Sequence, residues 1–100
     1  YEVRAQIGEQ LVLASPVKVA VNEYWVVNQS FVGVQEAVEA SNLNFYIDEE
    51  VGMIVIDLEG VNATFDSGDA IYLEPVFNEW SVEWVCSSNI KAAYLPSSCR

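Results

Sequence analysis

"YEVRAQIGEQLVLASPVKVAVNEYWVV", residues 1–27, predicts one long helix at the start of the chain. At about 100° per residue, its apolar side chains recur on one side, while its glutamates lie mainly on the other. The apolar stripe consists of Val3, Ile7, Leu11, Ala14, Val17, Val21 and Trp25. We therefore expect one face of the helix to be buried against the rest of the protein.

Two residues disturb this pattern. Pro16 removes an intrahelical hydrogen bond, so we expect a kink or an irregular turn there rather than two separate helices. Lys18 lies within the apolar stripe. Its aliphatic stem can follow apolar surface while its ammonium reaches water, and pairing with an acid of a neighbouring molecule is the alternative.

After residue 50 the apolar period changes from about 3.6 residues to about 2. The stretches "MIVIDLEG" (53–60), "DAIYLEPV" (69–76) and "WSVEWVC" (80–86) are rich in β-branched and aromatic residues and are separated by turn formers. We expect an antiparallel meander over 51–86. Alternation places on its inner face Ile54, Ile56, Leu58, Ile71, Leu73, Val82 and Trp84.

The segment 28–50 carries mixed signals and is interpreted as a connecting region. "GVQEAVEASN" (33–42) is compatible with a short helix or helical turn, and "LNFYIDEE" (43–50) with an extended stretch. The predicted fold is therefore α+β, with a long amino-terminal helix packed on an antiparallel sheet of about four strands. We expect a single domain over 1–100.

The charge of the chain excludes several classes of function. Fifteen acidic residues against four basic ones give a net charge of -11, which repels phosphate backbones and anionic lipid surfaces. The chain contains no histidine, the commonest general base, and shows no glycine-rich phosphate loop. We expect a soluble chain that is not an enzyme, holds no metal or other cofactor, and does not bind nucleic acid directly.

The two cysteines, Cys86 and Cys99, lie near the end of the chain. A disulfide, two free thiols and half of a metal site are all compatible with such a pair. A zinc site would need carboxylates to complete it, which is uncommon, so a disulfide is favoured. That choice implies an oxidising compartment and a closed loop over 86–99.

Three stretches, taken in order, resemble the type IV pilins of bacteria. Residues 1–24 are similar to the second half of the pilin helix, where an Arg-x-Gln and a Glu precede a Leu, an Ala, a Lys and an acid before an aromatic residue. Residues 61–88 resemble the last strands of the family, with a proline at Pro75 and a Trp-x-Cys ending at Cys86. "YLPSSCR" (94–100) resembles the carboxy-terminal signature.

This resemblance implies a type IVa major pilin, the structural subunit of a surface filament. Its expected partners are other copies of itself, the pilus assembly machinery, and a host-surface receptor or a phage. The filament would serve adhesion, twitching motility, phage attachment or DNA uptake. Its location would be the extracellular pilus (fimbrium), after an inner-membrane pool with the headgroup in the periplasm.

The family's processing site and the strongly apolar first half of its helix are not found in the sequence. We therefore expect a truncated headgroup, in contact with a membrane only through that apolar helix. A minor pilin that acts as a tip adhesin or DNA receptor is an alternative. A pseudopilin of type II secretion is another, although such proteins typically have a calcium-stabilised end rather than a disulfide loop.

The closed loop is the candidate contact surface for a receptor or a neighbouring subunit, and a purely structural role for it is the alternative. Its candidate contact residues are Asn89, Ile90, Lys91 and Tyr94. Other features have weaker functional interpretations. The tryptophans could form a sugar-binding surface, but core packing is favoured for them. The acidic clusters at 48–50 and 66–69 could bind calcium, but a solvated acidic surface is favoured there.

Overall fold

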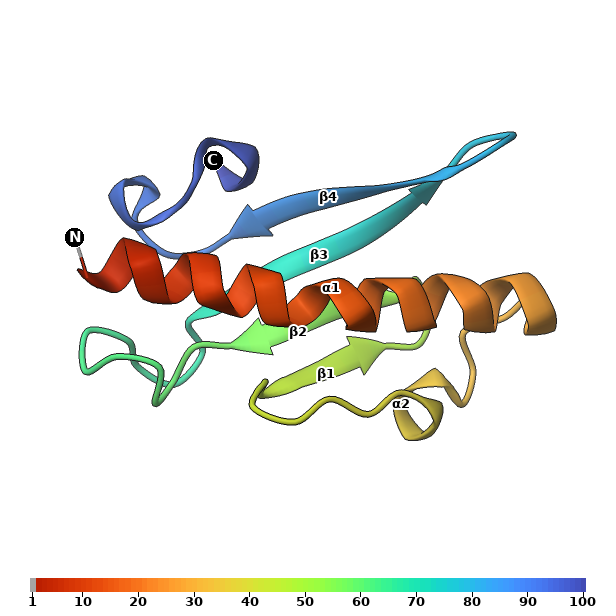
Figure 1. The fold of residues 1–100 in the computed structure, drawn as a ribbon, viewed down its shortest axis with the longest axis horizontal. Helices are drawn as coiled ribbons and strands as arrows, with labels where there is room; N and C mark the ends of the chain where they lie inside the picture. Colours follow the sequence, from red (N-terminus) through yellow and green to blue (C-terminus); the bar gives the residue numbers. More distant parts are fainter. Residues whose placement is uncertain (1) are drawn as a thin grey trace.

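The computed structural model describes residues 2–100. A long helix, α1 (Glu2–Asn28), runs along the longest dimension of the molecule, in front of a four-stranded sheet (Figure 1). A short helix, α2 (Val34–Ala37), precedes the sheet. The strands are β1 (Phe45–Asp48), β2 (Met53–Asp57), β3 (Ala70–Phe77) and β4 (Val82–Ser88), and two short 3₁₀ helices follow, η1 (Ala92–Tyr94) and η2 (Ser97–Cys99).

Helix α1 buries the face that the sequence predicts. Ile7, Ala14, Val17 and Val21 are at most 1% exposed, and the other members of the stripe are half-buried. The helix continues through Pro16 without interruption, so the expected irregular turn is absent from it. The proline ring costs one hydrogen bond, and the buried valine that follows it keeps the helix packed on the sheet across that position.

The sheet is an antiparallel meander with the order β1-β2-β3-β4. Its register places Ile54 opposite Leu73, and Leu73 opposite Cys86. Because neighbours across the strands point to the same face, these apolar residues form rows that cover the helix stripe. The predicted α+β fold, with a long helix on an antiparallel sheet, is confirmed.

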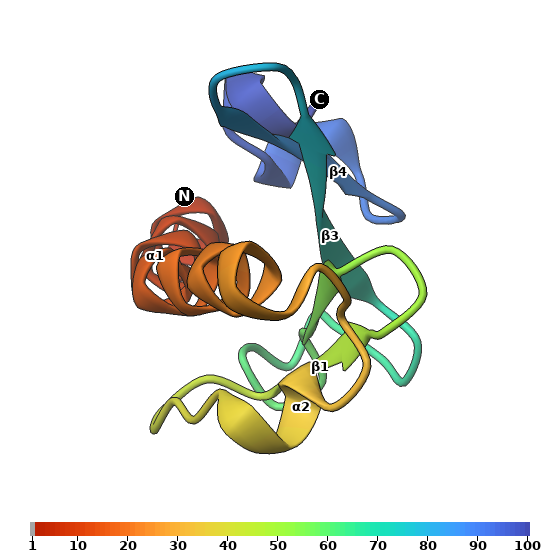
Figure 2. The same cartoon turned by 90° about the vertical axis from the view of Figure 1, so that its right-hand side faces the viewer.

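The end-on view shows two layers, with α1 on one side of the sheet (Figure 2). One apolar cluster joins the helix, the sheet and the carboxy-terminal segment, and its largest fully buried side chains are Ile7, Ile54, Ile56, Leu58, Ile71, Val17, Val21 and Val34. The core thus lies between the two layers.

The sheet begins earlier than the sequence predicts. Strand β1 lies inside the segment 28–50 that we interpreted as connecting, and its Ile47 is opposite Ile54 of β2. With four residues, β1 shows too few alternations to be distinguished from a loop by pattern alone, and its pairing with β2 holds it extended. None of the helices within residues 2–100 has the length and the apolar character needed to cross a membrane.

Candidate functional site: the disulfide-closed loop

The carboxy-terminal loop is closed by a disulfide between Cys86 of β4 and Cys99 of η2, whose Cα atoms are 4.6 Å apart. Cys99 is 3% exposed and belongs to the hydrophobic core. Leu95, midway along the loop, is also 3% exposed. The loop is therefore attached to the body of the protein by a covalent bond and by two buried side chains.

Hydrogen bonds fix both ends of the loop. The Asn89 side chain accepts from the Ala70 N–H at 2.9 Å and donates to the Gly68 carbonyl at 2.8 Å. At the far end, the Arg100 Nε–H donates to the Leu95 carbonyl at 2.9 Å. Since regular secondary structure is scarce in this segment, these bonds replace the ladder that would otherwise order it.

A hollow of 280 Å³ lies between the loop and the connection from β2 to β3. The Tyr94 ring meets the Phe65 ring edge-on, with centroids 5.9 Å apart, and forms part of its wall. The residues that line the hollow are Thr64, Phe65, Asp69, Asn89, Ile90, Lys91 and Tyr94. The four candidate contact residues are therefore brought together around one concave surface.

These four residues are not equally available for contact with another molecule. Asn89 uses its amide for the bonds to residues 68 and 70, and Ile90 and Tyr94 pack partly against the core. Lys91 is exposed. Its ammonium and the rim of the hollow are thus the chemically free part of the loop.

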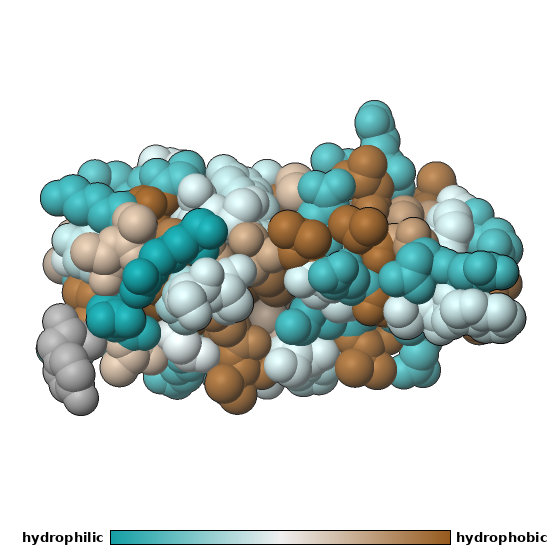
Figure 3. Space-filling model, turned by 90° about the horizontal axis from the view of Figure 1, so that it is seen from above, coloured by the Kyte–Doolittle hydropathy of each residue, from teal (hydrophilic) through white to brown (hydrophobic). Residues whose placement is uncertain are grey.

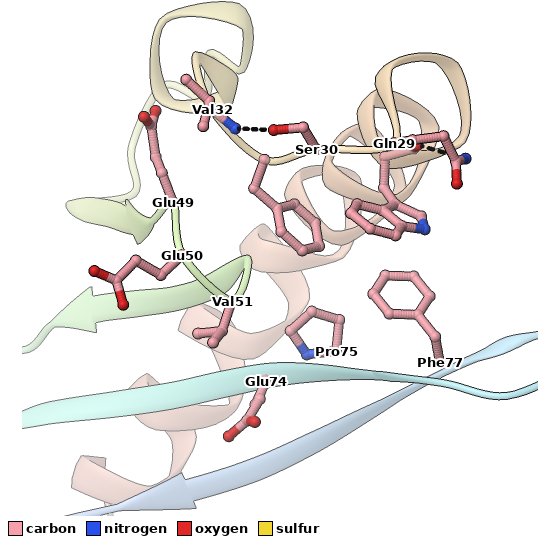
Figure 4. A pocket seen from close by; sticks show the side chains of 11 residues that line it. Gln29, Ser30, Val32, Glu49, Glu50, Val51, Glu74, Pro75 and Phe77 are labelled. Atoms are coloured by element: carbon pink, nitrogen blue, oxygen red, sulfur yellow. Dashed lines mark hydrogen bonds between the residues drawn. The ribbon is translucent and has the colours of Figure 1, made fainter.

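A second and larger hollow, of 720 Å³, lies at the other end of α1 (Figure 4). Three rings converge on it, one from α1, one from the connection between α1 and α2, and one from β3. Trp25 stacks on Phe31 with centroids 4.8 Å apart and on Phe77 at 5.2 Å. Figure 4 shows the Phe77 ring on one side of this hollow, while the carboxylates of Glu50 and Glu74 point away from it. The sequence alone did not indicate this cluster, because Phe31 and Phe77 lie outside the periodic stretches.

Glu49, on the turn after β1, holds the start of α2 in place. Its two carboxylate oxygens accept from the N–H groups of Gly33, at 3.1 Å, and Gln35, at 3.0 Å. These hydrogen bonds, the one to Gln35 first, lower the pKa of the Glu49 carboxyl below its usual value. The acidic cluster at 48–50 is thus used to order a turn.

The other acidic and aromatic candidates do not converge. Asp69 accepts from the Asp66 N–H at 2.8 Å, which closes a turn. Throughout residues 2–100, no group of three or more possible ligand side chains is placed to hold a metal ion. Trp25 packs with phenylalanines and Trp84 is half-buried, whereas Trp80 is 89% exposed. The three tryptophans therefore form no common surface.

Helix α1 also has an exposed apolar row on the side away from the sheet. Val12, Val19 and Val26 are 71%, 58% and 62% exposed. They follow one another at intervals of seven residues, about two helical turns, so they line up along the helix. In the view from above, hydrophobic surface occurs in several separate patches between hydrophilic ones (Figure 3).

Comparison with known proteins identifies the class to which this arrangement belongs. Residues 3–100 match the family model described as pilin (bacterial filament). The fimbrial protein EcpC of Eikenella corrodens is 32% identical over 114 aligned residues, which cover 100% of this chain and 72% of that protein.

Proposed function

The chain belongs to the pilin family, and from that membership we propose that its copies pack against one another along the exposed valine row of α1. The protein is a structural subunit of an extracellular bacterial pilus and assembles with other pilin subunits into a filament. Apolar side chains exposed in a line along a helix lose contact with water when a neighbouring helix covers them. This row is the observation that supports the proposed packing.

Val19, in the middle of the row, is the residue at which to test the packing. Val19→Asp would bury a carboxylate without a partner wherever another subunit covers this side of the helix. We expect the variant to fold, because the side chain is 58% exposed in the single chain. The yield of filaments sheared from cells that produce the variant should fall by at least about tenfold, which corresponds to about 1.4 kcal/mol in the equilibrium between free and assembled subunits.

Val32→Asp is the matched control, because Val32 is 73% exposed but follows the end of α1 and lies outside the row. It should leave the yield of filaments unchanged. Equal yields from the two variants, with equal amounts of folded subunit in the cells, would contradict packing along the row. The failure of cells to form any filament from the full-length protein without substitutions would contradict the subunit role itself.

We further propose that the hollow beside the disulfide loop is the surface by which the filament contacts a receptor, a phage or a neighbouring subunit. Lys91 supplies its exposed cation, and Asn89, Ile90 and Tyr94 hold the surface in shape. Lys91→Glu should reduce adhesion or phage attachment without reducing the number of filaments. Ser41→Glu, which adds a negative charge at an exposed turn between α2 and β1, is the control; an equal loss of attachment in both variants would count against the loop.

The filament's further roles follow from the same family. We propose that it serves adhesion and twitching motility, that the assembly machinery draws subunits from an inner-membrane pool with their headgroups in the periplasm, and that residues 1–100 act as one headgroup domain. We propose no catalytic activity for it. The abundance of the chain in sheared pili separates a major subunit from a minor pilin at the tip: the major subunit dominates, and a tip protein is present only in traces.

A further inference from the structure

An exposed tryptophan lies at the tip of the β3–β4 hairpin. Trp80 is 89% exposed, the highest value among the large hydrophobic side chains that are exposed within residues 2–100. Single exposed apolar residues are common, but a tryptophan exposed to this degree adds little to the core of its own chain. We therefore looked for a contact of Trp80 with another molecule.

The turn that carries Trp80 is well ordered by one asparagine. The Asn78 Oδ1 accepts from the N–H groups of Trp80, at 3.3 Å, and Ser81, at 3.0 Å, and from the Ser81 hydroxyl at 2.9 Å. The Asn78 N–H donates to the Ser81 carbonyl at 3.0 Å. The indole is thus presented on a fixed backbone, which lowers the entropy that a contact would cost.

A hollow of matching character lies at the opposite end of the molecule. Arg4, Ala5 and Gly8 of α1 and Pro96 before η2 line a space of 310 Å³. Apart from the adjacent backbone of the helix, a β-carbon placed on Gly8 would meet no atom within 4 Å, so the space over Gly8 is open. Small residues and a proline ring offer an apolar surface to an aromatic ring, and a guanidinium stacks well on an indole.

The charges around the two features are complementary. Glu79 and Glu83 flank the tryptophan and are exposed. The residues that line the hollow include the cation of Arg4 and no acid, and Arg100 ends the chain just after η2. Docking of the tip into the hollow of another copy would therefore bring carboxylates to guanidinium groups.

The hairpin tip and the hollow cannot meet within one copy. Figure 1 shows the tip between β3 and β4 toward one end of the long axis, and the first turns of α1 and the carboxy-terminal segment toward the other. The molecule is 40 Å long on that axis. Two different, complementary patches at opposite ends give a head-to-tail contact, which extends into a filament rather than closing into a dimer.

From these observations we propose that Trp80 of one copy inserts into the hollow over Gly8 of the next copy along the filament. The inference rests on the filament role proposed above and assigns to it a second contact, distinct from the valine row. One indole buries much less area than a stable complex needs, so the contact forms where assembly already holds the copies together.

A photo-crosslinking amino acid at position 80, carried by subunits in assembled filaments, tests the proposal. After irradiation and digestion, mass spectrometry should find it joined to a peptide that contains residues 4–8 or Pro96 of another copy. The same crosslinker at Tyr46, which is 57% exposed on the opposite face of the sheet from α1, is the control and should not give these products. Crosslinks from position 80 to any other surface, or none at all, would overturn the proposal.

Filling the hollow provides the second arm of the experiment. Gly8→Leu replaces a helical glycine by a better helix former in open space, so the variant should be at least as stable as the parent. In filaments of this variant, the crosslink from position 80 to residues 4–8 should fall at least about tenfold per assembled subunit, and an unchanged yield would refute the docking. Filaments that form without this crosslink reject the Trp80 contact alone, whereas the absence of filaments from the full-length protein without substitutions rejects the subunit role.

Discussion

Removal of the disulfide by the double change Cys86→Ala and Cys99→Ala is expected to lower the free energy of unfolding by about 3 kcal/mol. The bond joins residues 13 apart in the chain. A cross-link over a ring of this size removes about 10 cal/mol/K of entropy from the unfolded chain, which is about 3 kcal/mol at room temperature. The loss of contacts of the buried Cys99 sulfur adds to this cost.

Such a loss is large for a chain of 100 residues. Domains of this size are stable by about 5–15 kcal/mol, and each kcal/mol corresponds to about 4–8 °C in the midpoint of thermal unfolding. The midpoint should therefore fall by about 12–24 °C. Reduction of the unaltered protein should have nearly the same effect, since it breaks the bond and keeps both sulfur atoms in place.

Urea unfolding followed by tryptophan fluorescence measures the change, with Ser87→Ala as the control. Ser87 is an exposed residue next to Cys86 on β4, and its replacement should change the stability by no more than about 0.5 kcal/mol. Mass spectrometry with and without reductant verifies the bond through the gain of two hydrogens. If the alanine variant lies within about 1 kcal/mol of the parent, the view that the covalent closure stabilises the fold is wrong.

Three further predictions concern single side chains. The pKa of the Glu49 carboxyl is lowered below 4.5 in the folded protein, so ionised Glu49 stabilises the fold fully at pH values above its pKa in the unfolded chain. This stabilisation is lost as the pH falls through its pKa in the folded protein. Glu49→Gln should therefore make the free energy of unfolding depend less on pH in this acidic range, and NMR titration of the parent should give a pKa below 4.5. Gly52→Ala should destabilise the protein by clearly more than Gly60→Ala, as measured by urea unfolding. Both glycines have positive φ, which costs an alanine about 1–2 kcal/mol at either position. Of the two, only Gly52 would place its new methyl 2.5 Å from the Phe31 ring, so equal losses of stability would disprove the clash. Ile71→Ala removes a fully buried side chain from β3 and should cost about 2–5 kcal/mol in the same assay; a smaller loss would mean that the core closes over the cavity.

Much of the candidate site depended on contacts that no pattern in the sequence reveals. The loop was predictable because both cysteines lie in it, but Asn89 owes its role to residues 68 and 70, which are distant in the chain. Trp80 was expected at the start of the strand-like stretch 80–86, whereas β4 begins at Val82 and leaves Trp80 in the preceding turn. Its near-complete exposure, and the distance between its hairpin and the first turns of α1, became visible only in three dimensions.

The sequence by itself determined the long helix, its buried face and the inner face of the later strands. These properties follow from spacing along the chain, since a side chain's direction in a helix or strand repeats with a fixed local period. The tertiary structure alone decided that α1 passes Pro16 without the expected irregular turn, that the extended stretch within 43–50 pairs with β2 as a strand, and that Trp25, Phe31 and Phe77 share one hollow. The physical reason is that packing against distant residues outweighs a weak local preference, and a short segment with few alternations carries no period strong enough to predict its partners.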